Sequence, residues 1–301
     1  MPSRAVARRW ELAAQLRALR LERKLTLDDV ARLLFCSPAK VSRLENGRRG
    51  AQLDDVRRLA LIYGLSAEQT RHLMSLAEDV RVEPIWQIAD ASVAVQKYLE
   101  LEAAAHTIHW AESSRIPGLL QIPGYTTALL TRNLPILTGV DQPVESWVTL
   151  RPSRQRRLLE EPVLHLEVVI DEAAVRRAVG GPAVMAAQVA NLVQLSALQN
   201  VRLQLIPFNA GAHPGMEGPI VILGFTSEQR LTDSVFVEGL VGHLFVEDRP
   251  SVVRYTQAFE RLAGLALSPE GTREALTIVA QEWQQKAAWI DGTDDRGELG
   301  A

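Results

Sequence analysis

The sequence lacks several features that mark common classes of protein. It has one cysteine, Cys36, so it cannot form an internal disulfide or a metal site made of thiolates. Cys36 lies in an apolar stretch, where a small buried side chain is expected. No stretch approaches eighteen consecutive apolar residues, and arginines interrupt the start "MPSRAVARRWELAAQLRALR", where a signal peptide needs an apolar run. We therefore expect a cytoplasmic protein that does not enter a membrane.

Glycine-rich phosphate-binding loops are also missing. The Pro/Gly-rich segments "PGLLQIPGY" (117–125) and "GAHPGMEGP" (211–219) have neither the order G-x-x-x-x-G-K-[ST] nor G-x-G-x-x-G. The sequence therefore predicts no nucleotide cofactor. Because loops often form binding surfaces, these two segments are candidates for shaping a ligand or partner pocket.

Two small groups of titratable residues could suggest a metal site or catalysis. One group, on "HTIHWAE", could collect a metal on a helix face, but no cysteine or second cluster accompanies it, and we interpret it as a transition from helix to strand. The other group, on "VEGLVGHLFVE", fits two strands joined by a glycine-containing turn better than an acid–base pair. We predict no metal, no cofactor and no enzymatic activity. The residues in question are His106, His109 and Glu112 in the first group, and Glu238, His243 and Glu247 in the second.

The charge is divided unevenly along the 301 residues. Residues 1–80 hold 15 Lys and Arg against 10 Asp and Glu, which leaves 18 basic and 26 acidic residues for the remainder out of 33 and 36 in the chain. The first part is therefore net +5 and the rest net −8. A basic head on an acidic body favours a polyanion as the partner of the head.

The periodicity of apolar residues predicts an all-α head. Thr26 and Ser37 are expected N-caps, Pro38 suits a first helical position, and Gly47 supplies a left-handed stop. Ser66 and Gln69 form a capping-box pattern. Five helices are expected, over residues 8–23, 27–34, 37–46, 51–64 and 66–80.

The remaining residues alternate between apolar runs of strand type and helical patterns. This alternation predicts an α/β (α+β) domain with a mixed sheet of about four to six strands. The expected strands cover residues 163–170, 201–208, 219–225 and 234–238, and helices are expected at 88–104 and 184–198. We place the domains at 1–80 and 98–288, with a linker or connecting helix at 81–97 and a disordered tail at 289–301.

Two short helices joined by a tight turn, the second capped by serine and bearing basic side chains, form a helix-turn-helix pattern. Val41 and Leu44 must face inward, so the opposite face of residues 37–46 is free to enter the major groove of DNA. Lys40 and Arg43 are then expected to read guanine edges, with Ala39 available for a thymine methyl group. The full set of expected DNA contacts is Thr26, Ser37, Pro38, Ala39, Lys40, Ser42, Arg43, Asn46, Arg48, Arg49 and Gln52, where Arg48, Arg49 and the helix start at Gln52 hold phosphate.

The segment "LTLDDVARLLFCSPAKVSRLENGRRG" resembles the helix-turn-helix of Xre-type regulators. The resemblance implies that Arg20 and Glu45 form a buried structural pair. Two positions depart from the family pattern. Leu27 stands where a DNA-contacting glutamine is common, and Phe35 replaces the turn glycine, which leaves the geometry of the turn open because a bulky residue resists a positive φ.

The rest of the chain resembles the antitoxin-like, Scr-type domain of unknown function found in actinobacterial regulators. The resemblance runs from about residue 98 to 288 and rests on "RIPGLLQIPGYTTALL", "RQRRLL", "VIDEAAVRRAVGG", "QVANLVQLSALQNVRLQLIPF" and "VFVEG". It implies a transcriptional regulator encoded beside a small partner protein. The alternative is a DNA-binding sensor whose second domain binds a small molecule or has enzymatic activity.

Two further expectations concern partners. The basic run "RPSRQRR" (151–157) is either a solvated helix face answered by Glu160 and Glu161 or a contact for an acidic partner or flanking DNA. A homodimer on double-stranded DNA is expected, because one recognition helix reads only a few base pairs and two copies would occupy half-sites about one helical turn apart.

Overall fold

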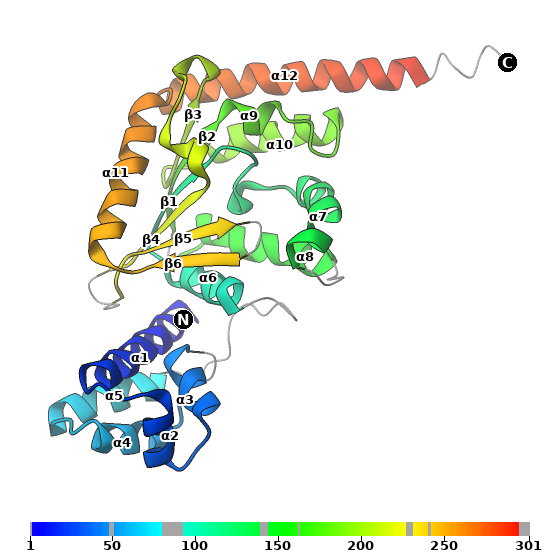
Figure 1. Cartoon of the computed structure of the whole chain (residues 1–301). Coiled ribbons are helices and arrows are strands. Elements are labelled where there is room, and N and C mark those ends of the chain that lie inside the picture. The colour runs from blue at the N-terminus through cyan, green and yellow to red at the C-terminus, as the bar shows by residue number, and fades with distance from the viewer. Residues whose placement is uncertain are drawn as a thin grey trace. The chain divides into compact units, whose positions relative to one another are not determined.

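The computed structural model describes residues 2–47, 51–79, 93–138, 144–161, 163–226, 231–239 and 242–294 (Figure 1). These residues fall into two compact units. The first consists of Met1–Ala105 with Phe225–Thr232, and the second of His106–Gly224 with Asp233–Ala301.

The first unit begins with the five helices that the sequence predicts. The first of them starts at Pro2 rather than at residue 8, since the arginines and alanines of this segment are good helix formers. The capping box at Ser66 is confirmed, because the Gln69 amide donates to Ser66 Oγ at 3.2 Å and Gln69 Oε1 accepts from the Ser66 amide at 2.9 Å. The helices are α1 (Pro2–Glu22), α2 (Leu27–Leu34), α3 (Pro38–Glu45), α4 (Leu53–Ile62) and α5 (Ala67–Asp79).

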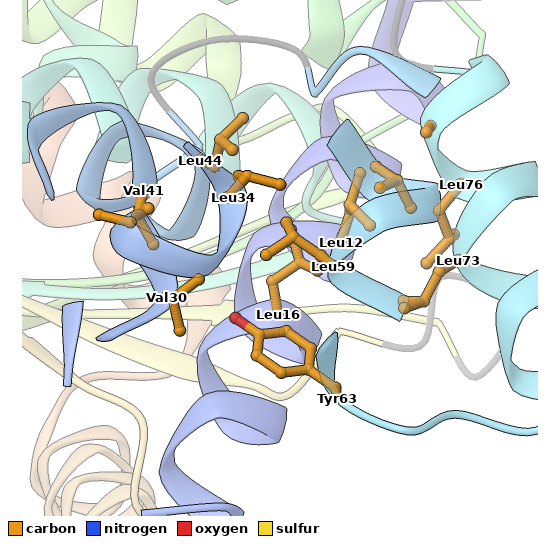
Figure 2. Close-up of a cluster of buried hydrophobic side chains, with 13 residues drawn as sticks. Leu12, Leu16, Val30, Leu34, Val41, Leu44, Leu59, Tyr63, Leu73 and Leu76 are labelled. Carbon is orange, nitrogen blue, oxygen red and sulfur yellow. The ribbon is translucent and has the colours of Figure 1, made fainter. Parts of the chain in front are cut away.

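One hydrophobic core joins these five helices. Figure 2 shows side chains from every helix meeting in it, and Cys36 packs against its margin as a partly buried apolar residue. Helices of eight residues, such as α2 and α3, are not stable alone in water, so this shared core is what keeps them folded. The labelled side chains of the core are Leu12, Leu16, Val30, Leu34, Val41, Leu44, Leu59, Tyr63, Leu73 and Leu76.

A sixth helix, α6 (Val93–Ala104), completes the first unit. The sequence divides this segment between the linker and the second domain, but its contacts place it against α1. Only Ala105 and His106 separate α6 from the first strand of the second unit.

The second unit is built on a six-stranded mixed sheet in the order β3-β2-β1-β4-β5-β6. Strands β1, β2 and β3 are parallel neighbours, whereas β4, β5 and β6 pair antiparallel with the strand before them in that order. The predicted α/β class and mixed sheet are thus confirmed. The strands are β1 (Thr107–Glu112), β2 (His165–Asp171), β3 (Val201–Ile206), β4 (Ile220–Gly224), β5 (Ser234–Gly239) and β6 (Gly242–Val246).

The sequence bounds four of these strands, and it indicates β1 and β6 through the expected helix-to-strand transition at 106–112 and the expected pair of strands at 237–247. The helix-to-strand transition expected at "HTIHWAE" is confirmed, because α6 ends at Ala104 and β1 begins at Thr107; no helix face therefore collects these histidines. The pair of strands expected there is confirmed, since Gly239 pairs with Gly242 and Glu238 with His243 across β5 and β6, whereas residues 240 and 241 between them lie outside the described residues. Strand β1 is central and buried, and its three polar side chains hide it from a search for apolar runs.

Helices cover the sheet and close its first edge. Helix α11 packs on one face, where Phe259 and Leu262 join a cluster with Val169 and Ile222, and Figure 1 shows it lying along the strands. At the edge strand β3, Leu205 donates to Thr272 Oγ1, and its carbonyl accepts from Leu267. The remaining helices are α7 (Pro123–Thr138), α8 (Val144–Gln155), α9 (Glu172–Arg176), α10 (Pro182–Leu195), α11 (Arg249–Leu265) and α12 (Pro269–Asp294).

Two expectations about this unit need correction, and a third is only partly described. Arg151 and Arg154 are buried, so the run 151–157 is not simply a solvated face. The segment 117–125 contributes Leu119, Leu120 and Tyr125 to the interior, and its expected part in a ligand or partner pocket stays a prediction. Helix α12 continues to Asp294, into the predicted tail, because its glutamine- and alanine-rich sequence favours helix; residues 295–301 lie outside the described residues.

Within the described part of the chain, we find no helix with the length and apolar character needed to cross a membrane.

Candidate nucleic-acid interface

Helix α2 is fixed at its start by a complete capping box. Thr26 Oγ1 accepts a hydrogen bond from the Asp29 amide at 3.1 Å, and Asp29 Oδ2 accepts from the Thr26 amide at 2.9 Å. The Thr26 hydroxyl also donates to Asp29, and these hydrogen bonds hold the pKa of Asp29 below its usual value. Thr26 is exposed at this helix start, as a phosphate contact would require.

The turn into the recognition helix is closed by a Schellman motif with phenylalanine in the glycine position. Phe35 adopts the left-handed conformation, with φ 55° and ψ 48°. Its amide donates to the Arg32 carbonyl at 3.3 Å, and the Cys36 amide donates to the Ala31 carbonyl at 2.9 Å. The turn therefore keeps the geometry that glycine would give, while the Phe35 side chain is 92% exposed.

Helix α3 presents the predicted face. Ser37 caps it by accepting from the Lys40 amide at 3.3 Å, and Pro38 occupies the first turn. Val41 and Leu44 point into the core, whereas Ser37, Pro38, Ala39, Arg43 and Asn46 are exposed and Ser42 is half-buried. The Asn46 side-chain amide donates to the Ser42 carbonyl at 2.8 Å. The Arg43 side chain has no hydrogen bond or ion pair within the described residues, so its guanidinium is available for DNA.

The end of α3 is held by a buried ion pair. Arg20 Nε and Nη2 donate to the two carboxylate oxygens of Glu45 at 2.7 and 2.8 Å, and Arg20 Nη1 donates to the Leu25 carbonyl at 2.9 Å. The hydrogen bonds to Glu45, together with the negative charge of that carboxylate, raise the pKa of Arg20 above its usual value. Both side chains serve the packing of α1 against α3, and neither is free to contact a base.

Lys40 has a partner that the sequence did not indicate. Its ammonium lies 2.7 Å from the carboxylate of Asp55 in the first turn of α4. The Lys40 side chain is 40% exposed and the Asp55 side chain 13%. Lys40 is therefore paired in the free protein and must leave Asp55 to contact a guanine. The sequence alone suggests another role for the two aspartates at 54–55. Their negative charges in the first turn interact favourably with the dipole of α4.

The phosphate contacts are described only in part. Gln52 is exposed at the start of α4 and makes no side-chain cap, so the first amides of α4 remain open toward an anion. Arg48 and Arg49 lie outside the described residues. Their assignment as phosphate ligands stays a prediction.

The last feature of this interface is the packing beneath Gly47, which lies just past the end of α3. Gly47 has φ +60°, and an added Cβ would lie 3.0 Å from two carbons of the Trp10 ring. Trp10 is buried and donates from Nε1 to Glu100 Oε2 at 2.8 Å. The sequence analysis did not identify Trp10. A single tryptophan in an arginine-rich helix nevertheless indicates a buried tertiary contact.

The titratable residues of the second unit form no metal cluster among the described residues. His109 stacks on Phe259 with ring centroids 5.0 Å apart. Glu112 is buried and pairs with Arg115 at 3.1 Å, and Arg115 also pairs with Glu238. Burial lowers the pKa of Arg115, but the carboxylates of Glu238 and Glu112 outweigh burial and raise its pKa overall.

Comparison with known families adds two matches. Residues 11–73 match the family described as "Helix-turn-helix domain", and residues 95–277 match "Domain of unknown function (DUF5753)". Comparison with curated proteins and with solved structures gives no match. The helix-turn-helix match supports a DNA-binding role in transcription regulation.

Proposed function

The chain belongs to the family of proteins with the domain of unknown function DUF5753, and we propose that it is a sequence-specific DNA-binding transcriptional regulator. The observation that supports this most strongly is the outer face of α3. Ala39 and Arg43 are exposed on it, and packing holds the inner face in place. An exposed arginine on a fixed helix can reach the O6 and N7 atoms of guanine. The Arg20–Glu45 pair supports assignment to the Xre type.

We further propose that the regulator acts as a homodimer on two half-sites. The reason is physical: one short helix reads only a few base pairs, whereas useful specificity needs more. Sedimentation of the purified chain with and without its operator would test this. One copy bound per operator would contradict it.

Selection of bound fragments from genomic DNA tests the main proposal. The wild-type chain should enrich a common sequence. Arg43→Ala should weaken binding to that sequence by about 1–3 kcal/mol and relax the preference at one base pair. Arg71→Ala, which removes an exposed arginine from α5, is the charge-matched control and should change binding far less. Equal losses on selected and random DNA for Arg43→Ala would remove its role as a base reader.

For the second unit we propose binding of a small partner protein, in an arrangement like that of toxin–antitoxin pairs. Phe208 and Met216 support a protein partner, because both are large apolar side chains that are 60% and 68% exposed on the segment between β3 and β4. Co-purification with the product of the adjacent small reading frame would test this. Phe208→Ser with Met216→Ser should abolish the association, whereas Leu61→Ser, at an apolar position in the head that is 77% exposed, should not. A chain that retains no such protein would contradict the proposal.

A small-molecule sensor is the second candidate function. It is favoured by His213, whose side chain is only 4% exposed. His213 Nε2 lies 2.9 Å from Asp171 Oδ2 at the carboxyl end of β2, but Nδ1 has no partner within the described residues. Ligands of α/β sheets bind beside such strand ends. A thermal-shift screen of metabolites on the full chain should then find a compound that raises the melting temperature, and His213→Phe should cancel the rise.

A further inference from the structure

The recognition helix is attached to α1 at two places. One is the ion pair between Arg20 and Glu45, the last residue of α3. The other is the Trp10 ring, which lies so close to Gly47 that an added Cβ would be 3.0 Å from it. Because only Asn46 separates Gly47 from the last residue of α3, a change in the tilt of this ring changes the surface on which the end of α3 rests.

The tilt of the Trp10 ring is set by α6. Glu100 accepts from Trp10 Nε1 at 2.8 Å and from Gln96 Nε2 at 3.2 Å, and it also forms an ion pair with Arg9. Lys97 lies over the ring, with Nζ 5.4 Å from the ring centroid. Both Trp10 and Glu100 are buried. A buried indole N–H needs a hydrogen-bond acceptor. The hydrogen bond to Glu100 therefore fixes the tilt of the Trp10 ring as well as its position.

Helix α6 belongs to the other family match. Most of it lies inside the DUF5753 match, yet its contacts place it in the first compact unit. The helix-turn-helix match ends at residue 73 and does not include it. The surface that supports the recognition helix therefore includes a side chain from the domain of unknown function.

On this basis we propose that Trp10 and Glu100 are positioning residues for DNA recognition: Glu100 of the DUF5753 domain holds the Trp10 ring against Gly47 and thereby sets the orientation of α3. This inference rests on the proposed DNA-binding function. Base contacts demand a defined helix orientation, whereas flexible side chains can still reach phosphates when the helix shifts. Loss of the hydrogen bond should therefore lower specific binding more than random binding.

Two substitutions of Glu100 separate its effect on the Trp10 ring from its effect on the packing of α6. Glu100→Gln and Glu100→Leu both remove the charge that pairs with Arg9. Any weakening of the packing of α6 that follows from the lost ion pair is therefore common to both variants. Only Glu100→Gln keeps an oxygen that can accept from Trp10 Nε1. Trp10→Phe removes the donor instead and keeps an aromatic ring beside Gly47.

The readout is the ratio of affinities for the selected operator and for a random duplex, measured with the full chain at one salt concentration. Glu100→Leu and Trp10→Phe should each lower this ratio by about tenfold, the equivalent of one lost buried hydrogen bond. Glu100→Gln should keep the ratio within about twofold of wild type. The double variant of Trp10→Phe with Glu100→Leu should be no worse than either single variant. Equal ratios for Glu100→Gln and Glu100→Leu would overturn the inference.

A second measurement does not depend on DNA. Amide hydrogen exchange at residues 44–47 should be faster in Glu100→Leu than in Glu100→Gln, while exchange in α5 should be the same in both. Unchanged exchange at residues 44–47 in Glu100→Leu would overturn the positioning role. If the wild-type chain selects no sequence, the proposed function fails, and the exchange result alone decides whether Glu100 positions α3.

Discussion

The ion pair between Arg20 and Glu45 allows a quantitative test of what holds the recognition helix. Its shortest N–O distance is 2.7 Å, and the two side chains are 11% and 4% exposed. The pair between Arg58 and Asp54 on α4 has a similar distance, 3.0 Å, but its side chains are 56% and 66% exposed. Distance alone would assign these pairs similar energies, so the difference between them must come from burial.

We expect Glu45→Leu to lower the free energy of unfolding of the head by about 3–5 kcal/mol, because the Arg20 guanidinium, whose side chain is only 11% exposed, keeps the Leu25 carbonyl as its one partner among the described residues. Asp54→Ala should cost only about 0.3–0.5 kcal/mol. Since small domains are stable by as little as about 5 kcal/mol, the first change would take away most of the stability. Adding Arg20→Leu to Glu45→Leu should restore part of it, because no unpaired charge then remains in the interior.

Hydrogen exchange of the full chain measures these changes, because peptides from the head report its opening separately from the second unit. The reasoning would be refuted if Glu45→Leu cost no more than Asp54→Ala. It would also fail if the double variant were destabilised by the sum of the two single changes, since that result would mean that each side chain contributes independently of the other.

Three further changes to the head have expected outcomes in the same exchange measurement. Phe35→Gly should stabilise the head by about 0.5–1 kcal/mol, because the relief of left-handed strain exceeds the entropy cost of glycine and no buried surface is lost; a destabilised variant would contradict this. Thr26→Ala should cost about 1 kcal/mol at neutral pH and less in acid, because the low pKa of Asp29 makes the cap weaken as the pH falls. Burial raises the pKa of Tyr63, so the stability that its neutral hydroxyl maintains is complete below about pH 10 and is lost as the pH rises further. Tyr63→Phe should remove this alkaline loss, and an unchanged pH profile would show that another group causes it.

The head could be predicted from sequence because its signals are local. Thr26, Ser37 and Ser66 act within three residues of themselves, and the apolar period that defines each helix also defines its inner face. The conformation of Phe35 was harder to foresee, since its side chain opposes a positive φ. The carbonyls of Ala31 and Arg32 nevertheless bind the amides that follow, and the turn closes with phenylalanine in the glycine position.

The second unit shows where local patterns fail. Arg151 and Arg154 look like a solvated charged face in the sequence, but both are buried, and the Arg151 guanidinium lies against Gly118. The bounds of strand β1 are hidden from a search for apolar runs for a related reason. Its polar side chains are accommodated by tertiary partners, such as Arg115 for Glu112, and no local pattern reports such partners.

Long-range pairs also change how the recognition helix should be understood. In the free protein Lys40 is bound to Asp55, and a partly exposed pair of this kind contributes about 0–1 kcal/mol. A good contact with the correct base contributes about 1–3 kcal/mol. Transfer of Lys40 from Asp55 to a guanine is therefore favourable on the correct site, whereas a weaker contact on random DNA leaves little gain or none. Where the contact is weaker than the pair, Lys40 stays with Asp55 and adds nothing to binding; where the contact is stronger, the energy of the pair is subtracted from it. A carboxylate beside the recognition helix is thus consistent with DNA binding, because it lowers the contribution of Lys40 by no more than the energy of the pair, about 0–1 kcal/mol.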